Sequence, residues 1–178
     1  MFQGIIMAGF GGQGIISGGI MLAYAGMIDG KNVTFFPAYG AEMRGGTANC
    51  SVVVSSDPVA SPVVGSPDTV LVLNEPSLPR FEPTLKENGL LFINTSLVAS
   101  KPIRKDITVI EIPANDIAEE LGNIKCANMV MLGAYAKKTG AVSLDTLKES
   151  IKKVYIRATD DMIEVNKQAV DQGAAVIG

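Results

Sequence analysis

The residues best suited to bind a ligand lie in a glycine-rich turn near the amino terminus. Gly9, Gly11 and Gly14 follow the G-x-G-x-x-G spacing that binds dinucleotides when it stands between a strand and a helix. Such glycines permit a tight turn and let a phosphate approach the amino end of the helix. That fingerprint also needs an acid at the end of the second strand, which here ends in Phe35-Phe36-Pro37. The turn is therefore a dinucleotide site, a tight crossover that packs its own helix, or a contact loop for another ligand.

A second segment with the potential for ligand contact, residues 39–46, precedes a strand of alternating polarity. Glu42 and Arg44 are the only charged residues between positions 31 and 57. Two glycines follow Arg44 and let a ligand or another backbone come close. A guanidinium there could hold a phosphate or a carboxylate in a fork. A surface turn with two solvated charges is an equal alternative.

Composition excludes several kinds of self-contained catalyst. The chain has no histidine, which removes His-based triads and His metal sites. Cys50 and Cys126 form no CxxC pair, whereas an iron–sulfur cluster needs about four thiolates. We expect two buried thiols in a reducing cytoplasm, with a reactive Cys126 at a helix start as the alternative. The net charge of −3 argues against a nucleic-acid partner, which would need a basic stripe.

The amino terminus is apolar without resembling a membrane segment. Its first 28 residues carry no charged side chain, and no basic residue precedes Lys31, so a signal peptide is not expected. The glycine-rich turn interrupts the run, whereas a span needs about 20 mostly apolar residues. Charged residues make up 19% of the chain, below the usual value of about 25%. Apolar surface of this extent indicates a partner interface.

The elements that position these segments follow from hydrophobic patterning. Most of the apolar runs are short and typical of buried parallel strands, and Pro37 is expected to stop the second. Residues 47–55 alternate in polarity, which favours a half-exposed antiparallel strand. The six predicted strands are residues 3–8, 33–36, 47–55, 69–73, 90–94 and 107–112.

Helical patterns dominate the last third of the chain. Helices are predicted from residue 15 to 23, from 115 to 121 and from 128 to 138, and two more after the N-cap residues Ser143 and Thr159. With no repeat and no long linker, residues 1–178 are predicted to form one α/β domain with a mostly parallel sheet.

Four segments occur along the chain in a characteristic order. They are Gly11-Gly12-Gln13-Gly14-Ile15, Tyr39-Gly40-Ala41-Glu42-Met43-Arg44-Gly45-Gly46, Asn128-Met129-Val130-Met131-Leu132-Gly133-Ala134, and Asn166…Ala169…Gly173. Together they resemble the gamma subunit family of 2-oxoacid:ferredoxin oxidoreductases over nearly the whole chain. The resemblance implies a three-layer α/β/α Rossmann-like domain with a mixed, mostly parallel sheet.

The resemblance also implies a role in an enzyme complex. The reaction converts a 2-oxoacid, with 2-oxoglutarate favoured, and CoA to an acyl-CoA and CO2 while ferredoxin is reduced. This subunit would have no catalytic groups and bind no cofactor alone. Thiamine diphosphate, Mg²⁺ and the iron–sulfur clusters would lie on alpha, beta and ferredoxin-like delta subunits in the cytoplasm, without membrane or nucleic acid.

Family analogy makes the two glycine-bearing loops the expected surface toward the partner subunits or bound CoA. The contact residues are Gly11, Gly12, Gln13, Gly14, Tyr39, Glu42, Arg44, Gly45 and Gly46. Two other functions remain as alternatives: a free-standing Rossmann-type dinucleotide-binding protein and a pure assembly scaffold.

Overall fold

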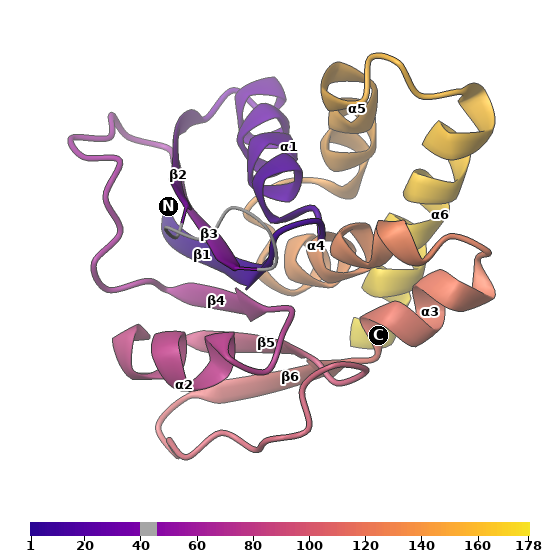
Figure 1. Ribbon diagram of the computed structural model, residues 1–178. Helices are drawn as coiled ribbons and strands as arrows, with labels where there is room; N and C mark the ends of the chain where they lie inside the picture. Colours follow the sequence, from indigo (N-terminus) through magenta and orange to yellow (C-terminus); the bar gives the residue numbers. More distant parts are fainter. Residues whose placement is uncertain (40–45) are drawn as a thin grey trace.

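A six-stranded mixed sheet forms the centre of the structure, a computed structural model that describes residues 1–39 and 46–178 (Figure 1). The strand order is β2-β3-β1-β4-β5-β6, where β1, β4, β5 and β6 run parallel and β3 runs antiparallel to β1 and β2. The strands are β1 (Phe2–Phe10), β2 (Asn32–Tyr39), β3 (Thr47–Ser55), β4 (Thr69–Val72), β5 (Leu90–Asn94) and β6 (Thr108–Ile112).

The helices cover the two faces of this sheet unequally. In Figure 1, α1, α4, α5 and α6 stand together on one side, whereas α2 lies apart from them beside β4 and β5. The helices are α1 (Ile15–Ile28), α2 (Ser77–Phe81), α3 (Ala114–Glu120), α4 (Ala127–Thr139), α5 (Leu144–Val154) and α6 (Asp160–Ile177), with 3-10 turns η1 (Glu82–Thr84) and η2 (Ile124–Cys126). This arrangement confirms the predicted three-layer α/β/α class with a mixed sheet.

Two hydrophobic clusters correspond to the two faces. The larger one joins alternate sheet residues such as Met7 and Phe92 to α1, α3, α4, α5 and α6. The smaller one joins the intervening residues, such as Ile6 and Ile93, to Leu78 and Phe81. The period of two along each strand therefore divides the apolar residues between the two layers of helices.

The helix α4 is buried on all sides from Ala127 to Ala136 and packs directly against α6. A Cβ atom added at Gly133 would lie 2.0 Å from the carbonyl oxygen of Val170, and one at Gly173 would lie 1.9 Å from that of Val130. The two glycines therefore let the backbones of the two helices touch where no side chain fits.

The predicted strand boundaries mostly hold, with two corrections. The ranges of β3 and β5 are those predicted, and β3 is antiparallel as expected. Pro37 does not stop the second strand: β2 continues to Tyr39, because β2 is an edge strand where a missing N–H costs no ladder bond. The run ending in β6 is not a buried strand, since β6 lies at the other edge and most of its residues are exposed or half-buried.

The predicted helix starts in the last third are confirmed at their caps. The Ser143 hydroxyl accepts the N–H of Thr146, and the Thr159 hydroxyl accepts the N–H of Met162. The short helix α2 was not predicted, because its five residues include a proline and are too few to show a helical period.

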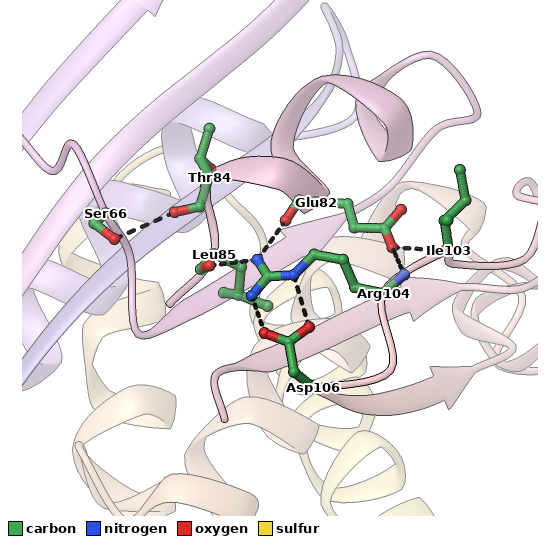
Figure 2. A network of polar contacts seen from close by, with 7 residues as sticks. All are labelled: Ser66, Glu82, Thr84, Leu85, Ile103, Arg104 and Asp106. Carbon is green, nitrogen blue, oxygen red and sulfur yellow. Dashed lines mark hydrogen bonds and ion pairs between the residues drawn. The ribbon is translucent and has the colours of Figure 1, made fainter. Parts of the chain in front are cut away.

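A polar network fastens η1 to the segment that precedes β6 (Figure 2). The buried Glu82 carboxylate accepts the backbone N–H groups of Ile103 and Arg104 at 2.6 and 2.7 Å. The Arg104 guanidinium donates to the carbonyl oxygens of Glu82 and Leu85 and to the Asp106 carboxylate. The hydrogen bond from Arg104 holds the pKa of Asp106 below its usual value. The network lies at the amino ends of the parallel strands and has a structural role.

No helix in the described part of the chain combines the length and apolar character that crossing a membrane would require.

Candidate functional site

The turn after β1 adopts a backbone conformation that favours glycine at two positions. Gly12 has a φ of +96° and Gly14 a φ of +72°, both in the left-handed region. Gly14 is also the N-cap residue of α1 and brings no side chain to cap the helix. The first N–H groups of α1 therefore face the turn without the usual acceptor from an N-cap side chain.

Gln13 holds this turn in place. Its Oε1 accepts the backbone N–H of Phe10 at 2.6 Å, and its Nε2 donates to the carbonyl oxygen of Leu73 at 3.1 Å. The side chain thus ties the end of β1 to the end of β4. Both polar atoms of Gln13 are used within the chain, so its contribution to a site is the shape of the turn.

Asn128, near the start of α4, stabilises the glycine-rich turn through a hydrogen bond. Its Nδ2 donates to the carbonyl oxygen of Gly14 at 3.0 Å, and the residue is fully buried. A Cβ atom at Gly14 would lie 2.3 Å from that Nδ2. Reasoning from the sequence did not place Asn128 at the site, although a lone amide in an apolar run was a signal that it had a partner.

The sheet register places Tyr39 and Gly46, the two ends of the second segment, at the same edge of the sheet as the glycine-rich turn. Phe10, the last residue of β1, is paired with Thr47, the first of β3, and the Gly11 N–H donates to the Gly46 carbonyl oxygen at 3.1 Å. Tyr39 is paired through its backbone with Ala48 at the end of β2.

Five of the predicted contact residues therefore lie together. They are Gly11, Gly12, Gln13, Gly14 and Gly46. The other predicted contacts of the second loop, Glu42, Arg44 and Gly45, lie outside the described residues.

A cavity of about 200 Å³ lies beside the turn, between Gly12 and Gln13 on one side and Asn115 and Lys125 on the other. It stands at the carboxyl ends of β1 and β4, where the chain leaves the two neighbouring strands toward opposite faces through α1 and α2. Such a crevice is the usual binding position in open α/β sheets. Lys125 provides the cation among its lining residues, which suits a phosphate or a carboxylate.

This arrangement has the groups for binding an anion and few groups for acid–base chemistry. Among residues 1–39 and 46–178, no three His, Cys, Asp or Glu side chains are grouped as metal ligands. Burial raises the pKa of Cys50 to about 12. Burial also raises the pKa of Cys126, whose Sγ donates to the carbonyl oxygen of Asn123. Both cysteines lie in the core, as the sequence predicted.

Both thiols should therefore be inert in the folded chain. Treatment of the native protein with N-ethylmaleimide is expected to give no adduct by intact mass within an hour, because the reactive thiolate is scarce and buried. The same treatment in guanidinium chloride should modify both cysteines. A native adduct on Cys126 would favour the reactive alternative.

Comparison with known proteins places the fold and the motifs in one family. The family model for pyruvate ferredoxin/flavodoxin oxidoreductase matches residues 4–176. The ketoisovalerate oxidoreductase subunit VorA of Methanothermobacter marburgensis is 37% identical over 94% of this chain, which covers 35% of VorA. The chain thus spans about a third of the length of this relative. The 2-oxoglutarate synthase subunit KorC of the same organism is 35% identical, with 99% of this chain and 97% of KorC covered.

Solved structures agree with these relatives. The gamma subunit of a keto/oxoacid ferredoxin oxidoreductase from Geobacter sulfurreducens superimposes with a TM-score of 0.87 at 29% identity, covering 99% of this chain and 97% of the other. A 2-oxoglutarate:ferredoxin oxidoreductase from Magnetococcus marinus, with 2-oxoglutarate, coenzyme A and succinyl-CoA bound, gives 0.90 at 27% identity and covers 99% of this chain and 31% of that one. The resemblance drawn from the four motifs is confirmed: the chain belongs to the pyruvate ferredoxin/flavodoxin oxidoreductase family.

Proposed function

We propose that this chain, as one domain of residues 1–178, is the gamma subunit of a cytoplasmic 2-oxoacid:ferredoxin oxidoreductase that acts on 2-oxoglutarate. The observation that carries the proposal is the end-to-end correspondence with KorC, which covers 97% of that 2-oxoglutarate synthase subunit. The complex would convert the 2-oxoacid and CoA to an acyl-CoA and CO2, with ferredoxin as the electron acceptor.

The redox cofactors belong on the alpha, beta and ferredoxin-like delta partners in this proposal. Thiamine diphosphate with Mg²⁺ would supply the decarboxylation chemistry and iron–sulfur clusters the electron transfer. The residues of this chain do not fit a cluster, since Cys50 and Cys126 are its only thiols, both are fully buried, and burial raises both of their pKa values. We therefore derive no redox step on this chain.

The role of the chain is to bind and orient CoA or a partner subunit at the edge of the sheet that carries its two glycine-bearing segments. The exposed backbone at Gly12, where an added Cβ atom would meet nothing within 4 Å, leaves room for a ligand or a partner backbone. Lys125 supplies a positive charge beside it, and Arg44 would supply a second. Gln13 and Asn128 keep the turn in shape through their hydrogen bonds to Phe10, Leu73 and Gly14. A CoA phosphate or a partner carboxylate would suit these cations.

Co-purification and an activity panel test this function. A tag on this chain, expressed with the genes that flank its own, should retrieve a brown complex that reduces ferredoxin with 2-oxoglutarate and CoA faster than with pyruvate or 2-oxoisovalerate. The chain expressed alone should be colourless, without the absorbance of an iron–sulfur cluster at about 400 nm. It should also show no turnover of 2-oxoacids. A cluster or activity in the isolated chain would contradict the assignment as a non-catalytic subunit.

Calorimetry distinguishes this function from a dinucleotide-binding one. We expect no micromolar binding of NAD or NADP, because β2 ends in Ala38 and Tyr39 and brings no acid for the ribose hydroxyls. Micromolar binding of either nucleotide would favour the Rossmann-type alternative.

A further inference from the structure

A second and larger cavity adjoins the one beside the glycine-rich turn, where η2 faces the connection between α5 and α6. Its volume is about 480 Å³, within the range of about 300–1,000 Å³ that is typical of small-molecule sites. Val154, Ala158 and Met162 give it an apolar wall. At its border Ile156 is 80% exposed.

The charged residues that line this cavity are both basic. Lys125 reaches it from η2 and Arg157 from the α5–α6 connection, and no carboxylate is among the described residues that line it. This is notable in a chain with 18 acidic and 15 basic residues. The nearest acids along the chain, Asp160 and Asp161, begin α6 outside the lining and are solvent-exposed.

Asn166 adds a fixed polar group to the wall. It is 5% exposed, and its Nδ2 donates to the carbonyl oxygen of Met162 at 2.7 Å. Asn166 belongs to the Asn166…Ala169…Gly173 motif, and all three of these residues lie within α6. The orientation of Asn166 is therefore set by α6 itself, and a preorganised polar group of this kind is typical of ligand sites.

We infer that this cavity binds an amphipathic organic anion, with its apolar body against Val154, Ala158 and Met162 and its phosphate or carboxylate between Lys125 and Arg157. The apolar wall provides the burial and the two cations provide the selection for negative charge. Lys125 also lines the cavity beside Gly12 and Gln13, so the two cavities meet at this residue. At Lys125 the inference rests on the proposed function, whereas Arg157 lines only this cavity, so Arg157→Gln tests the inference separately.

Methionine methyl NMR tests binding in the full chain at a known position. The protein is labelled with methyl-¹³C methionine, and the signal of Met162 is assigned with the Met162→Leu variant. Octanoate and adenosine monophosphate are then titrated separately, as an apolar carboxylate and an apolar-faced phosphate. We expect a saturable shift of the Met162 signal with at least one of them, and the stronger binder identifies the head group. Met27 is 57% exposed against 49% for Met162 and lies on α1, so its signal is the internal control.

Charge variants test the proposed head-group contact. Arg157→Gln and Lys125→Gln should each weaken binding of the better probe at least about fivefold, since each removes a charge-assisted hydrogen bond. Lys153→Gln, an exposed lysine on α5 outside the cavity, is the matched control and should bind as the wild type does. Absence of a saturable Met162 shift with both probes would overturn the inference. Equal affinities in Arg157→Gln, Lys125→Gln and Lys153→Gln would also overturn it.

Discussion

Alanine at Gly133 is expected to destabilise the chain by about 3 kcal/mol or more, the upper end of what overpacking of a core costs. The added Cβ would lie 2.0 Å from the carbonyl oxygen of Val170, well inside contact distance. That oxygen belongs to the backbone of α6, so no rotamer change can relieve the clash. The two helices must move apart, and contacts are then lost along their whole crossing. Since a domain of this size is stable by about 5–15 kcal/mol, a large share of its stability would be lost.

Chemical denaturation followed by circular dichroism measures this effect. Gly173→Ala should behave in the same way, because its Cβ would lie 1.9 Å from the carbonyl oxygen of Val130 on the facing helix. Gly65→Ala is the matched control, since a Cβ there meets nothing within 4 Å. If Gly133→Ala unfolded at the same denaturant concentration as Gly65→Ala, the close backbone contact of α4 and α6 would be refuted.

Replacement of Arg44 with alanine is expected to leave the folding of the isolated chain unchanged and to impair the assembled complex at least tenfold. Arg44 is the single basic residue between positions 31 and 57 and is followed by two glycines. Truncating one member of a buried charge pair costs about 2–5 kcal/mol, whereas a solvated surface residue costs within about 0.5 kcal/mol. The loss should appear as weaker assembly or as a higher apparent KM for CoA.

The control for Arg44→Ala is Lys105→Ala. Lys105 is exposed and precedes β6, at the opposite end of the parallel strands from the glycine-rich turn. Sedimentation velocity measures assembly, and initial rates at varied CoA measure the KM. If the Arg44 variant assembled as the wild type does and had the wild-type KM for CoA, the alternative of a surface turn with solvated charges at residues 39–46 would be favoured.

Local patterns predicted those parts of the fold that local physics determines. The alternation along residues 47–55 corresponds to β3, and the capping hydroxyls of Ser143 and Thr159 mark the starts of α5 and α6. The predictions that Pro37 ends its strand and that residues 107–112 form a buried strand were wrong. Both strands lie at edges of the sheet, and the position of a strand in the sheet decides whether a proline is tolerated and whether the strand is covered. That position depends on pairing between distant segments, which periodicity along one segment does not report.

The candidate site was predicted in part for the same reason. The glycine spacing pointed to the turn itself. The hydrogen bonds that shape it join Gln13 to Leu73 and Asn128 to Gly14, across 60 and 114 positions of the chain. The cavity around Lys125 and Arg157 likewise combines η2 with the α5–α6 connection. Residues brought together over such separations show no spacing that could be recognised in the sequence.

The near-complete burial of α4 has a consequence for biosynthesis. The sheet strands and α1 are all made before residue 113, whereas α4 ends at Thr139. Until α4 emerges, a ribosome-bound chain therefore has only α1 and the short α3 to cover this apolar face of the sheet. The chain is most prone to aggregation at that stage of synthesis. Because α6 locks α4 through Gly173, a chain released early would lack this lock. Expression of this protein should thus depend more on synthesis through its last helix than on any residue of its ligand-binding edge.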